Sequence, residues 1–350
     1  TSGEPGAGAN FWIRGISTFG ANDRPLVLVD GIERSLDLVD AEDIESLSIL
    51  KDATATAVYG VRGANGIVLI TTKRGKEGKP SIRANVEYGL STPTVMPKTA
   101  DAGQWIDYYN DISLDAYGRP AYTPQQKEMF LNGTDPDLYP NVNWFDEMFN
   151  KMSDSERFNF NIRGGKKAVH YFMSASIKRD GGNLKSRSKE FFSFNNNINV
   201  IRYDFVNNLS IKMTPTTKVA LGLNVSMKDW KGPAKSADEI FSLSRQASPV
   251  DFPVYYPSEW EKLSYTLWGG MEGGTFNNGY RNPVAEYATG YKTTFSSTVD
   301  AKFRIDQDLK MILPGLKWYG LVSFKNYSST VVTRTAGYNQ FQIASDNGDG

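Results

Sequence analysis

The chain has 350 residues, no cysteine and a formal net charge of zero, because 39 Lys and Arg balance 39 Asp and Glu. This balance gives no support to nucleic-acid binding or to docking on an anionic membrane surface. The absence of cysteine excludes a disulfide framework and a thiolate metal site. An aromatic content of 13% with 32 glycines favours β structure and turns. The first residues do not form a signal peptide, so we expect the numbering to begin inside a larger precursor.

A β-branched run at residues 67–72 stands between glycines and basic residues. This pattern predicts a buried strand between two tight turns. Gly60, Gly63 and Gly66 bracket the preceding turn, where the backbone approaches a neighbour closely or takes a positive φ. The four basic residues around this domain are expected to pair with carboxylates on the inner wall of a surrounding barrel, or else to be ordinary solvated charges. They are Arg14, Arg62, Lys73 and Arg74.

A short helix is expected over residues 41–50, ahead of that strand. Four carboxylates lie at its start: Asp40, Glu42, Asp43 and Glu45. A paired acid and base is one interpretation of them, but capping and solvating the helix is favoured.

From Ser81 onward, apolar and polar residues alternate with a period of two, which is typical of strands with two different faces. In residues 169–178 only Phe172 interrupts the polar face. The pattern predicts seven strands, at 82–91, 158–162, 169–178, 205–213, 219–228, 298–306 and 318–327.

The connections between these strands fall into two length classes. Tight turns are expected at 164–168, 214–217 and 313–316, and long loops at 92–156, 182–201 and 230–293. Short turns on one side and long loops on the other are typical of an outer-membrane barrel. A soluble antiparallel sheet with one wet face remains the alternative that alternation alone leaves open. Seven is an odd number and bacterial single-chain barrels close with even numbers, so we expect this chain to be a fragment.

The long loops contain the residues that we expect to determine specificity. Thr123 as N-cap, Pro124 at the first position and Gly133 as stop predict a helix. Flat aromatic side chains suit stacking on sugar rings or peptide side chains, and they equally suit packing within a loop or against a partner. The candidate substrate- or lid-facing aromatics are Trp230, Tyr255, Tyr256, Trp260 and Trp268.

Catalytic constellations do not emerge from the sequence. The single histidine, His170, cannot build a His-based triad or a His-rich metal site. Residues 346–350 resemble part of a calcium loop but lack the EF-hand spacing and its bidentate Glu. We therefore expect a protein that is not an enzyme and has no cofactor and no metal.

Three motifs resemble a known family. They are the segment 11–15, PLVLVDGI at 25–32 and the run 43–76, followed by a first barrel strand from Ser81. Together they closely resemble the plug and early barrel of the SusC/RagA-like TonB-dependent transporters. The plug-motif residues are Arg14, Gly15, Asp30, Gly31, Lys51, Asp52, Tyr59, Gly60, Arg62, Gly63, Asn65 and Gly66. The family's TonB box, the early half of its plug and its later strands have no counterpart in the sequence.

The resemblance implies a membrane β fold, namely a transmembrane antiparallel β-barrel with an α+β plug in its lumen. The family's barrel has about 22 strands, of which roughly seven are present. Residues 1–80 would be the C-terminal part of the plug domain, and residues 81–350 the first strands and extracellular loops of the barrel.

The resemblance also implies a function and its partners. The protein would import oligomeric nutrients across the outer membrane, with glycan oligosaccharides as the first expectation and oligopeptides as the second. Its partners would be a SusD-like surface lipoprotein, TonB with ExbB and ExbD, and the lipid of the outer membrane, but no nucleic acid. Alternatives are a passive porin, a siderophore- or cobalamin-type TonB-dependent receptor, a barrel enzyme and a soluble lectin-like sandwich.

Overall fold

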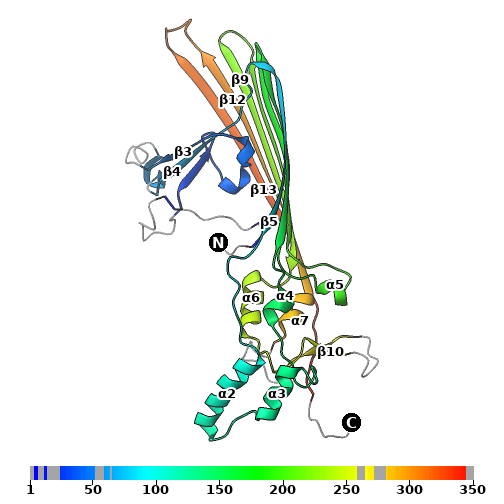
Figure 1. Cartoon of the computed structure of the whole chain (residues 1–350). Coiled ribbons are helices and arrows are strands. Elements are labelled where there is room, and N and C mark those ends of the chain that lie inside the picture. Colours follow the sequence, from blue (N-terminus) through cyan, green and yellow to red (C-terminus); the bar gives the residue numbers. More distant parts are fainter. Residues whose placement is uncertain are drawn as a thin grey trace.

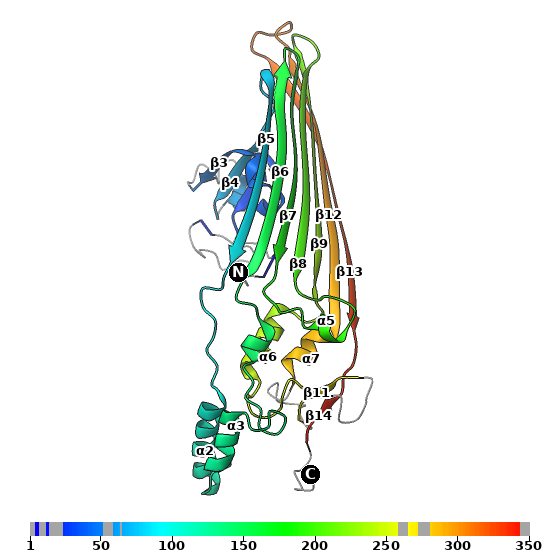
Figure 2. The same cartoon turned by 45° about the vertical axis from the view of Figure 1, so that its right-hand side comes forward.

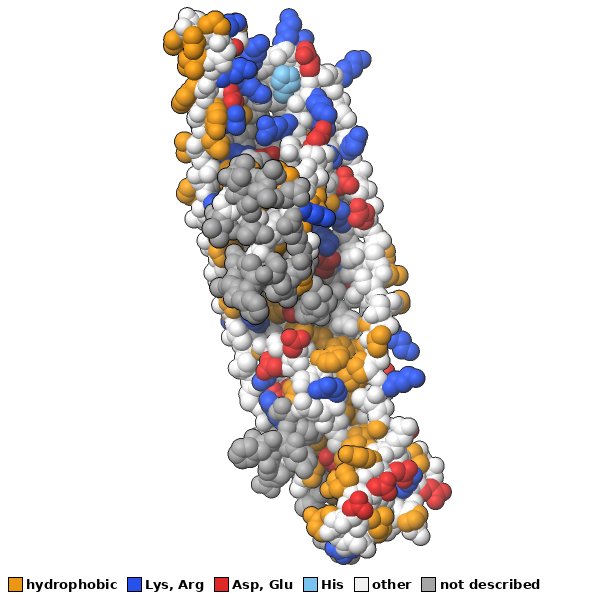
Figure 3. Space-filling view, turned by 90° about the vertical axis from the view of Figure 1, so that its left-hand side faces the viewer, with side chains coloured by type: hydrophobic (Ala, Val, Ile, Leu, Met, Phe, Trp, Pro, Cys, Tyr) orange, Lys and Arg blue, Asp and Glu red, His pale blue; other side chains and the backbone are white. Residues whose placement is uncertain are grey.

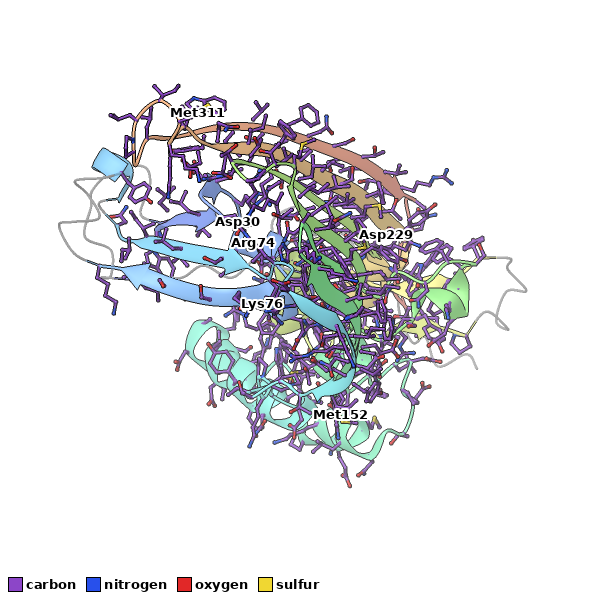
Figure 4. All side chains as sticks on the ribbon, turned by 90° about the horizontal axis from the view of Figure 1, so that it is seen from above. Asp30, Arg74, Lys76, Met152, Asp229 and Met311 are labelled. Carbon is purple, nitrogen blue, oxygen red and sulfur yellow. The ribbon has the colours of Figure 1, made fainter. Side chains whose placement is uncertain are left out.

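A long seven-stranded antiparallel sheet forms the axis of the protein, and a small four-stranded sheet packs against one of its faces (Figure 1). The structure is a computed structural model that describes residues 4–6, 12–13, 24–51, 59–63, 65–257, 265–271 and 281–343. Viewed along the strands, the large sheet is curved, and the small sheet lies on its concave side (Figure 4).

The large sheet confirms the seven strands predicted from alternation. Its order, β13-β12-β9-β8-β7-β6-β5, is a meander in which each strand pairs with its neighbours along the chain (Figure 2). The strands are β5 (Gly78–Ser91), β6 (Ser153–Lys166), β7 (Val169–Gly181), β8 (Asn199–Lys212), β9 (Thr217–Pro233), β12 (Gly290–Asp308) and β13 (Lys317–Thr335). Each extends beyond its predicted core, because ladder hydrogen bonds continue where the apolar alternation has faded.

The two ends of this sheet differ as expected. Three short connections, 167–168, 213–216 and 309–316, join strands at one end, and all the helices labelled in Figure 1 lie at the other. Among the described residues, no helix has the length and apolar character required to cross a membrane.

The long loops fold into a layer with its own hydrophobic core. Trp144, Ile240, Phe252 and Tyr287 are among its fully or almost fully buried side chains. The helices are α2 (Ala102–Tyr117), α3 (Pro124–Asn132), α4 (Trp144–Met148), α5 (Ser188–Phe191), α6 (Ala237–Gln246) and α7 (Pro283–Ala288). Three short strands form a third sheet: β10 (Tyr255–Tyr256), β11 (Leu267–Gly269) and β14 (Gln340–Phe341).

The helix predicted from Thr123, Pro124 and Gly133 is confirmed as α3. The Thr123 hydroxyl accepts a hydrogen bond from the Gln126 backbone, and the Gln126 side chain accepts one from the Thr123 backbone. Gly133 ends the helix in the left-handed region at φ 60°. Together α2 and α3 form a projecting tip on which acidic and hydrophobic side chains gather (Figure 3).

The small sheet has the order β2-β1-β4-β3, with β1 and β4 parallel. Its strands are β1 (Leu26–Val29), β2 (Ile32–Glu33), β3 (Ile44–Leu50) and β4 (Ile67–Thr72). Short 3₁₀ turns occupy η1 (Leu36–Leu38), η2 (Ala41–Asp43) and η3 (Gly60–Gly63). The buried strand predicted at 67–72 is therefore confirmed, with Ile67, Val68 and Ile70 almost fully buried.

The helix expected over residues 41–50 is wrong. Only residues 41–43 turn, as η2, and the rest is the strand β3, which pairs antiparallel with β4. The alternation of serine with Leu47 and Ile49 suits an edge strand, and the ladder to β4 outweighs the local helical pattern. The capping role itself is confirmed for Asp40, whose carboxylate accepts a hydrogen bond from the Glu42 backbone.

Candidate functional site: the interface between the small sheet and the strand wall

The large sheet presents one polar face and one apolar face, and the small sheet contacts the polar one. On β7, the polar face carries Ser174, which is buried, and also Phe172, the residue that interrupts the alternation. Phe172 is completely buried. The exception in the pattern is thus a buried side chain, and its partner across the ladder, Asn208, donates hydrogen bonds to Thr72 and Lys73 of the small sheet.

Asp30 is the centre of the interface. It follows β1 in the Asp-Gly turn to β2 and takes a positive φ of 49°, a conformation that aspartate tolerates better than most residues. Its carboxylate accepts hydrogen bonds from the Thr72 backbone (3.0 Å) and hydroxyl (2.7 Å), which tie it to the end of β4. From the wall, Lys302 Nζ reaches the same carboxylate at 2.6 Å. Both side chains are buried, at 2% and 13% exposure.

Burial opposes the charge on Asp30, but the Lys302 ammonium and the hydrogen bonds from Lys302 and Thr72 outweigh it. The net effect lowers the pKa of Asp30. The carboxylate is therefore ionised at neutral pH and forms a buried ion pair between the small sheet and β12. Arg74, which leaves β4 beside it, lies 3.7 Å from the same carboxylate (Figure 4).

A second ion pair connects the same two elements. Arg34, just after β2, lies 3.5 Å from the Asp300 carboxylate on β12, and both side chains are more than nine-tenths buried. Asp300 and Lys302 project from the same face of β12 because they are two positions apart. One strand of the wall thus offers an acid and a base to two turns of the small sheet.

Two further pairs hold the opposite edge of the small sheet. Asp40 binds Arg157 of β6, and Glu45 lies 3.2 Å from Arg163, six residues further along that strand and on the same face. Lys76 adds a 2.8 Å contact to Glu45. Asp40 and Glu45 therefore face basic side chains of the wall and do not form a paired acid and base.

Asp43 is the exception among these carboxylates. It is 2% exposed, and burial raises its pKa to about 6, against a hydrogen bond with Ser174 of the wall. The neighbouring Asp40 and Asp204 raise the pKa further, whereas Lys73 lowers it. A buried carboxylate that titrates close to neutrality lies directly between the small sheet and β7.

The expectation that basic residues of the small sheet pair with carboxylates of the wall is wrong for Lys73 and Arg74. Lys73 contacts Glu42, through both its backbone carbonyl and its carboxylate, and Arg74 contacts Asp30, so both basic residues pair within the small sheet. The wall instead supplies the cations and the small sheet the carboxylates, except at Arg34 and Asp300. Arg14 and the side chain of Arg62 lie outside the described residues.

The predicted plug-motif residues fall into three groups. Asp30 is the interface residue described above, and the glycines serve the turns: Gly31, Gly60 and Gly66 take positive φ, and Gly63 is buried. Tyr59 packs against the core of the small sheet, Asn65 is half-buried and Lys51 is exposed. Gly15 and Asp52, like Arg14, lie outside the described residues.

The candidate aromatics occupy different environments. Tyr256 and Trp268 are buried in the loop layer, where the Trp268 ring meets Phe191 at 4.6 Å between centroids, so packing within the loops is their role in this structure. Tyr255 is 42% exposed and meets the Phe191 ring edge-on at 5.6 Å between centroids. Trp230 projects from β9 with Lys292 above its ring at 5.7 Å. Trp260 lies outside the described residues.

Sequence reasoning missed the residues of the wall that bind the small sheet: Asp300, Lys302, Arg157 and Arg163. A signal for them exists, because charged residues recur on the face of each strand that alternates with the apolar face. Which of these charges meets a partner depends on strand register, which alternation does not supply. Among the described residues, no group of acidic and histidine side chains is placed to hold a metal ion.

Comparison with known proteins agrees with this architecture. The family model of the TonB-dependent receptor plug domain matches residues 1–67. TonB-dependent receptor P26 of Formosa agariphila is 30% identical over 328 residues, covering 91% of this chain and 29% of the relative. TonB-dependent receptor SusC of Bacteroides thetaiotaomicron is 27% identical, covering 96% of this chain and 33% of the relative. The chain thus spans about a third of the length of these curated relatives.

A solved structure supports the fold independently. The RagAB peptide importer in its open-open state superposes with a TM-score of 0.71 at 22% identity, covering 97% of this chain and 38% of the other. The small sheet is therefore plug, and the seven-stranded wall is part of a transmembrane β-barrel, which defines an outer-membrane protein of the plug-and-barrel class. Within that class, the chain belongs to the SusC/RagA-like TonB-dependent receptors.

Proposed function

We propose that the complete protein imports oligomeric nutrients across the outer membrane and that movement of the plug gates this import. The observation that carries the proposal is the plug sheet itself, which is fixed to the polar face of the wall by separate ion pairs at Asp30, Arg34, Asp40 and Glu45. Separating a buried ion pair returns both charged groups to water and recovers the desolvation energy that the pair costs, whereas an apolar interface of the same extent resists separation. The interface is thus suited to repeated opening.

In this proposal, residues 1–80 belong to the plug domain and residues 81–350 to the barrel strands and their loops. The start of β5 at Gly78 supports that division. A SusD-like lipoprotein would capture cargo against the loop layer, and TonB, with ExbB and ExbD, would pull on the plug using the proton gradient. No covalent chemistry is proposed.

Oligosaccharides are the first proposed cargo, and the exposed Tyr255 and the half-buried Trp230 are the proposed stacking residues. The similarity of the fold to a peptide importer keeps oligopeptides as the second. Binding of a labelled oligosaccharide and of a labelled oligopeptide to the full-length protein distinguishes them, since only the label of the true cargo class binds and is displaced by its own unlabelled form.

Uptake by cells that produce the full-length protein tests the function. We expect uptake of the cargo to stop when an uncoupler collapses the proton gradient, while binding at the cell surface persists. Uptake that continues without the gradient would instead identify a passive porin. Displacement of the label by a ferric siderophore or cobalamin, but not by oligomers, would identify the other receptor type.

A further inference from the structure

A row of four basic side chains crosses the plug-facing side of the wall. Strand register places Arg157 of β6 opposite Lys178 of β7, Lys178 opposite Arg202 of β8, and Arg202 opposite Lys228 of β9. All four lie on the polar face, in line with each other. We call these four residues the cation row.

Such a row destabilises the sheet unless anions or dipoles face it, because like charges directly opposite each other on neighbouring strands repel. The plug supplies those groups in this structure. Asp40 binds Arg157, Arg202 donates to the Asp37 carbonyl oxygen, and Lys228 donates to the Gly6 carbonyl oxygen at 2.7 Å. Lys178 contacts Asp180 of its own strand at 3.0 Å. At Arg202 and Lys228 the hydrogen-bond partners from the plug are neutral carbonyl groups, and Asp204 interacts electrostatically with Arg202, as Asp37 and Glu4 do with Lys228.

A cavity of about 630 Å³ opens in front of the row. Its lining includes Arg157, Lys178 and Arg202 from the wall and residues 39–41 from the plug. Carboxylates line it as well, but Glu87 faces Arg157 at 3.4 Å, Glu156 lies 3.6 Å from Arg179, and Asp204 hydrogen-bonds with Ser226. These acids thus have partners of their own, whereas Arg202 and Lys228 donate hydrogen bonds to carbonyl oxygens of the plug.

We propose that the cation row is an anion-binding site for acidic oligosaccharides, whose carboxylate or sulfate groups compete with Asp40 and the plug carbonyls for the four basic side chains. The inference rests on the proposed import function and narrows its substrate class. Asp40 already demonstrates the recognition chemistry, because a carboxylate on a guanidinium is the contact that an acidic sugar would make. Basic side chains on four neighbouring strands match an extended oligomer with repeated charges better than a single small anion.

Binding of matched probes to the purified full-length protein tests the proposal. The probes are maltotetraose and its fully sulfated derivative, and tetraglutamate is added as a peptide with similar charge. At low ionic strength we expect the sulfated sugar to bind at least about tenfold more tightly than the neutral one, with the difference lost in high salt because salt screens exposed charges. Equal binding of both sugars, or binding of neither, would overturn the proposal. Tighter binding of tetraglutamate would overturn the assignment to saccharides.

Substitutions test whether the cation row causes the preference for the sulfated sugar. The double variant Arg202→Gln with Lys228→Gln should abolish the preference for the sulfated sugar. Asp40→Asn should strengthen that binding several-fold, because asparagine keeps the cap on η2 but no longer competes for Arg157. Lys231→Gln on the other face of β9, where Lys231 pairs with Asp229, is the matched control and should change nothing. An unchanged double variant, or a control that loses as much, would rule out the cation row.

This assay needs no proton gradient, so the two proposals fail separately. Gradient-driven uptake without charge preference would remove only the acidic substrate class. A charge preference in a protein whose uptake ignores the gradient would remove the gating function and leave the anion site.

Discussion

At the scale of single residues, Asp30 explains why an Asp-Gly turn occurs in this plug. A type of turn that needs positive φ could use asparagine or glycine at the same position equally well. Only aspartate also accepts the Thr72 hydrogen bonds and neutralises Lys302. The residue therefore closes the β1–β2 turn and holds the plug to the wall with one carboxylate.

Removal of Lys302, the partner of Asp30, should weaken the docking of the plug on the wall. In Lys302→Ala, the Asp30 carboxylate stays buried without its cation, which we expect to destabilise plug docking by about 3 kcal/mol. Hydrogen–deuterium exchange of the β1 and β4 amides should become faster, and Lys310→Ala, in the exposed turn of the same hairpin, serves as the control. Unchanged protection in Lys302→Ala would show that the pair does not hold the plug.

Asp43 should make docking sensitive to pH. Its pKa is raised from 3.8 to about 6 when docked, so the docked state binds more protons than the undocked state between these values. Docking is then favoured below about pH 4 and loses up to about 3 kcal/mol as the pH rises through 6. The pKa of Asp30 is lowered, so its contribution has the opposite sign and is lost only as the pH falls below about 4.

Urea titration of plug protection at pH 5 and pH 7 measures this effect. The wild-type midpoint should be lower at pH 7, and Asp43→Asn should remove the difference between the two pH values. A variant that keeps the same difference would assign the pH dependence to another group.

At the scale of elements, the strand wall was predictable and the plug only partly so. Alternation located all seven wall strands, because one face must be apolar along its whole length. Helix α3 was predictable because its caps are local. Strand β3 was not, because residues 44–50 are held extended by the ladder to β4, whose paired residues lie 17 to 28 positions further along the chain.

The same limit applies to the interface. Asp30 and Asp40 were identifiable from the sequence, but their wall partners, Lys302 for Asp30 and Arg157 for Asp40, are 272 and 117 residues away along the chain. For Lys73 and Arg74 the prediction was wrong in the other direction. We expected both residues to pair with carboxylates of the wall, but they pair with Glu42 and Asp30 of the small sheet. Pairing of long side chains is decided by tertiary register, which a single sequence does not contain.

The outward face of the wall gives a test at this scale. Leu223 and Phe303 project from the apolar face of β9 and β12, opposite to Asn224 and Lys302. If the side chain lies at mid-depth in the bilayer, Leu223→Arg should destabilise the folded barrel by roughly 2–4 kcal/mol. Guanidinium titration in lipid vesicles measures it, and Leu223→Met is the control. Full stability of Leu223→Arg would count against the outward assignment.

At the scale of the whole molecule, the two ends of the wall differ in structure. Short turns close one end, while the loops at the other build a layer with its own core (Figure 2). The plug lies between these ends on the concave face, where its ion pairs meet β6 and β12. This arrangement places a polar, exchangeable contact in the path between the loop layer and the turns.

The most direct test of plug gating is a reversible lock between plug and wall. The chain contains no cysteine, so Asp43→Cys with Ser174→Cys introduces a defined pair at two side chains that hydrogen-bond across the interface. Uptake of labelled cargo by cells with the full-length double variant is then measured before and after reduction, with each single variant as control. If movement of the plug gates import, uptake stops under oxidising conditions and returns on reduction. Uptake that continues with the disulfide formed would show that import does not require this movement.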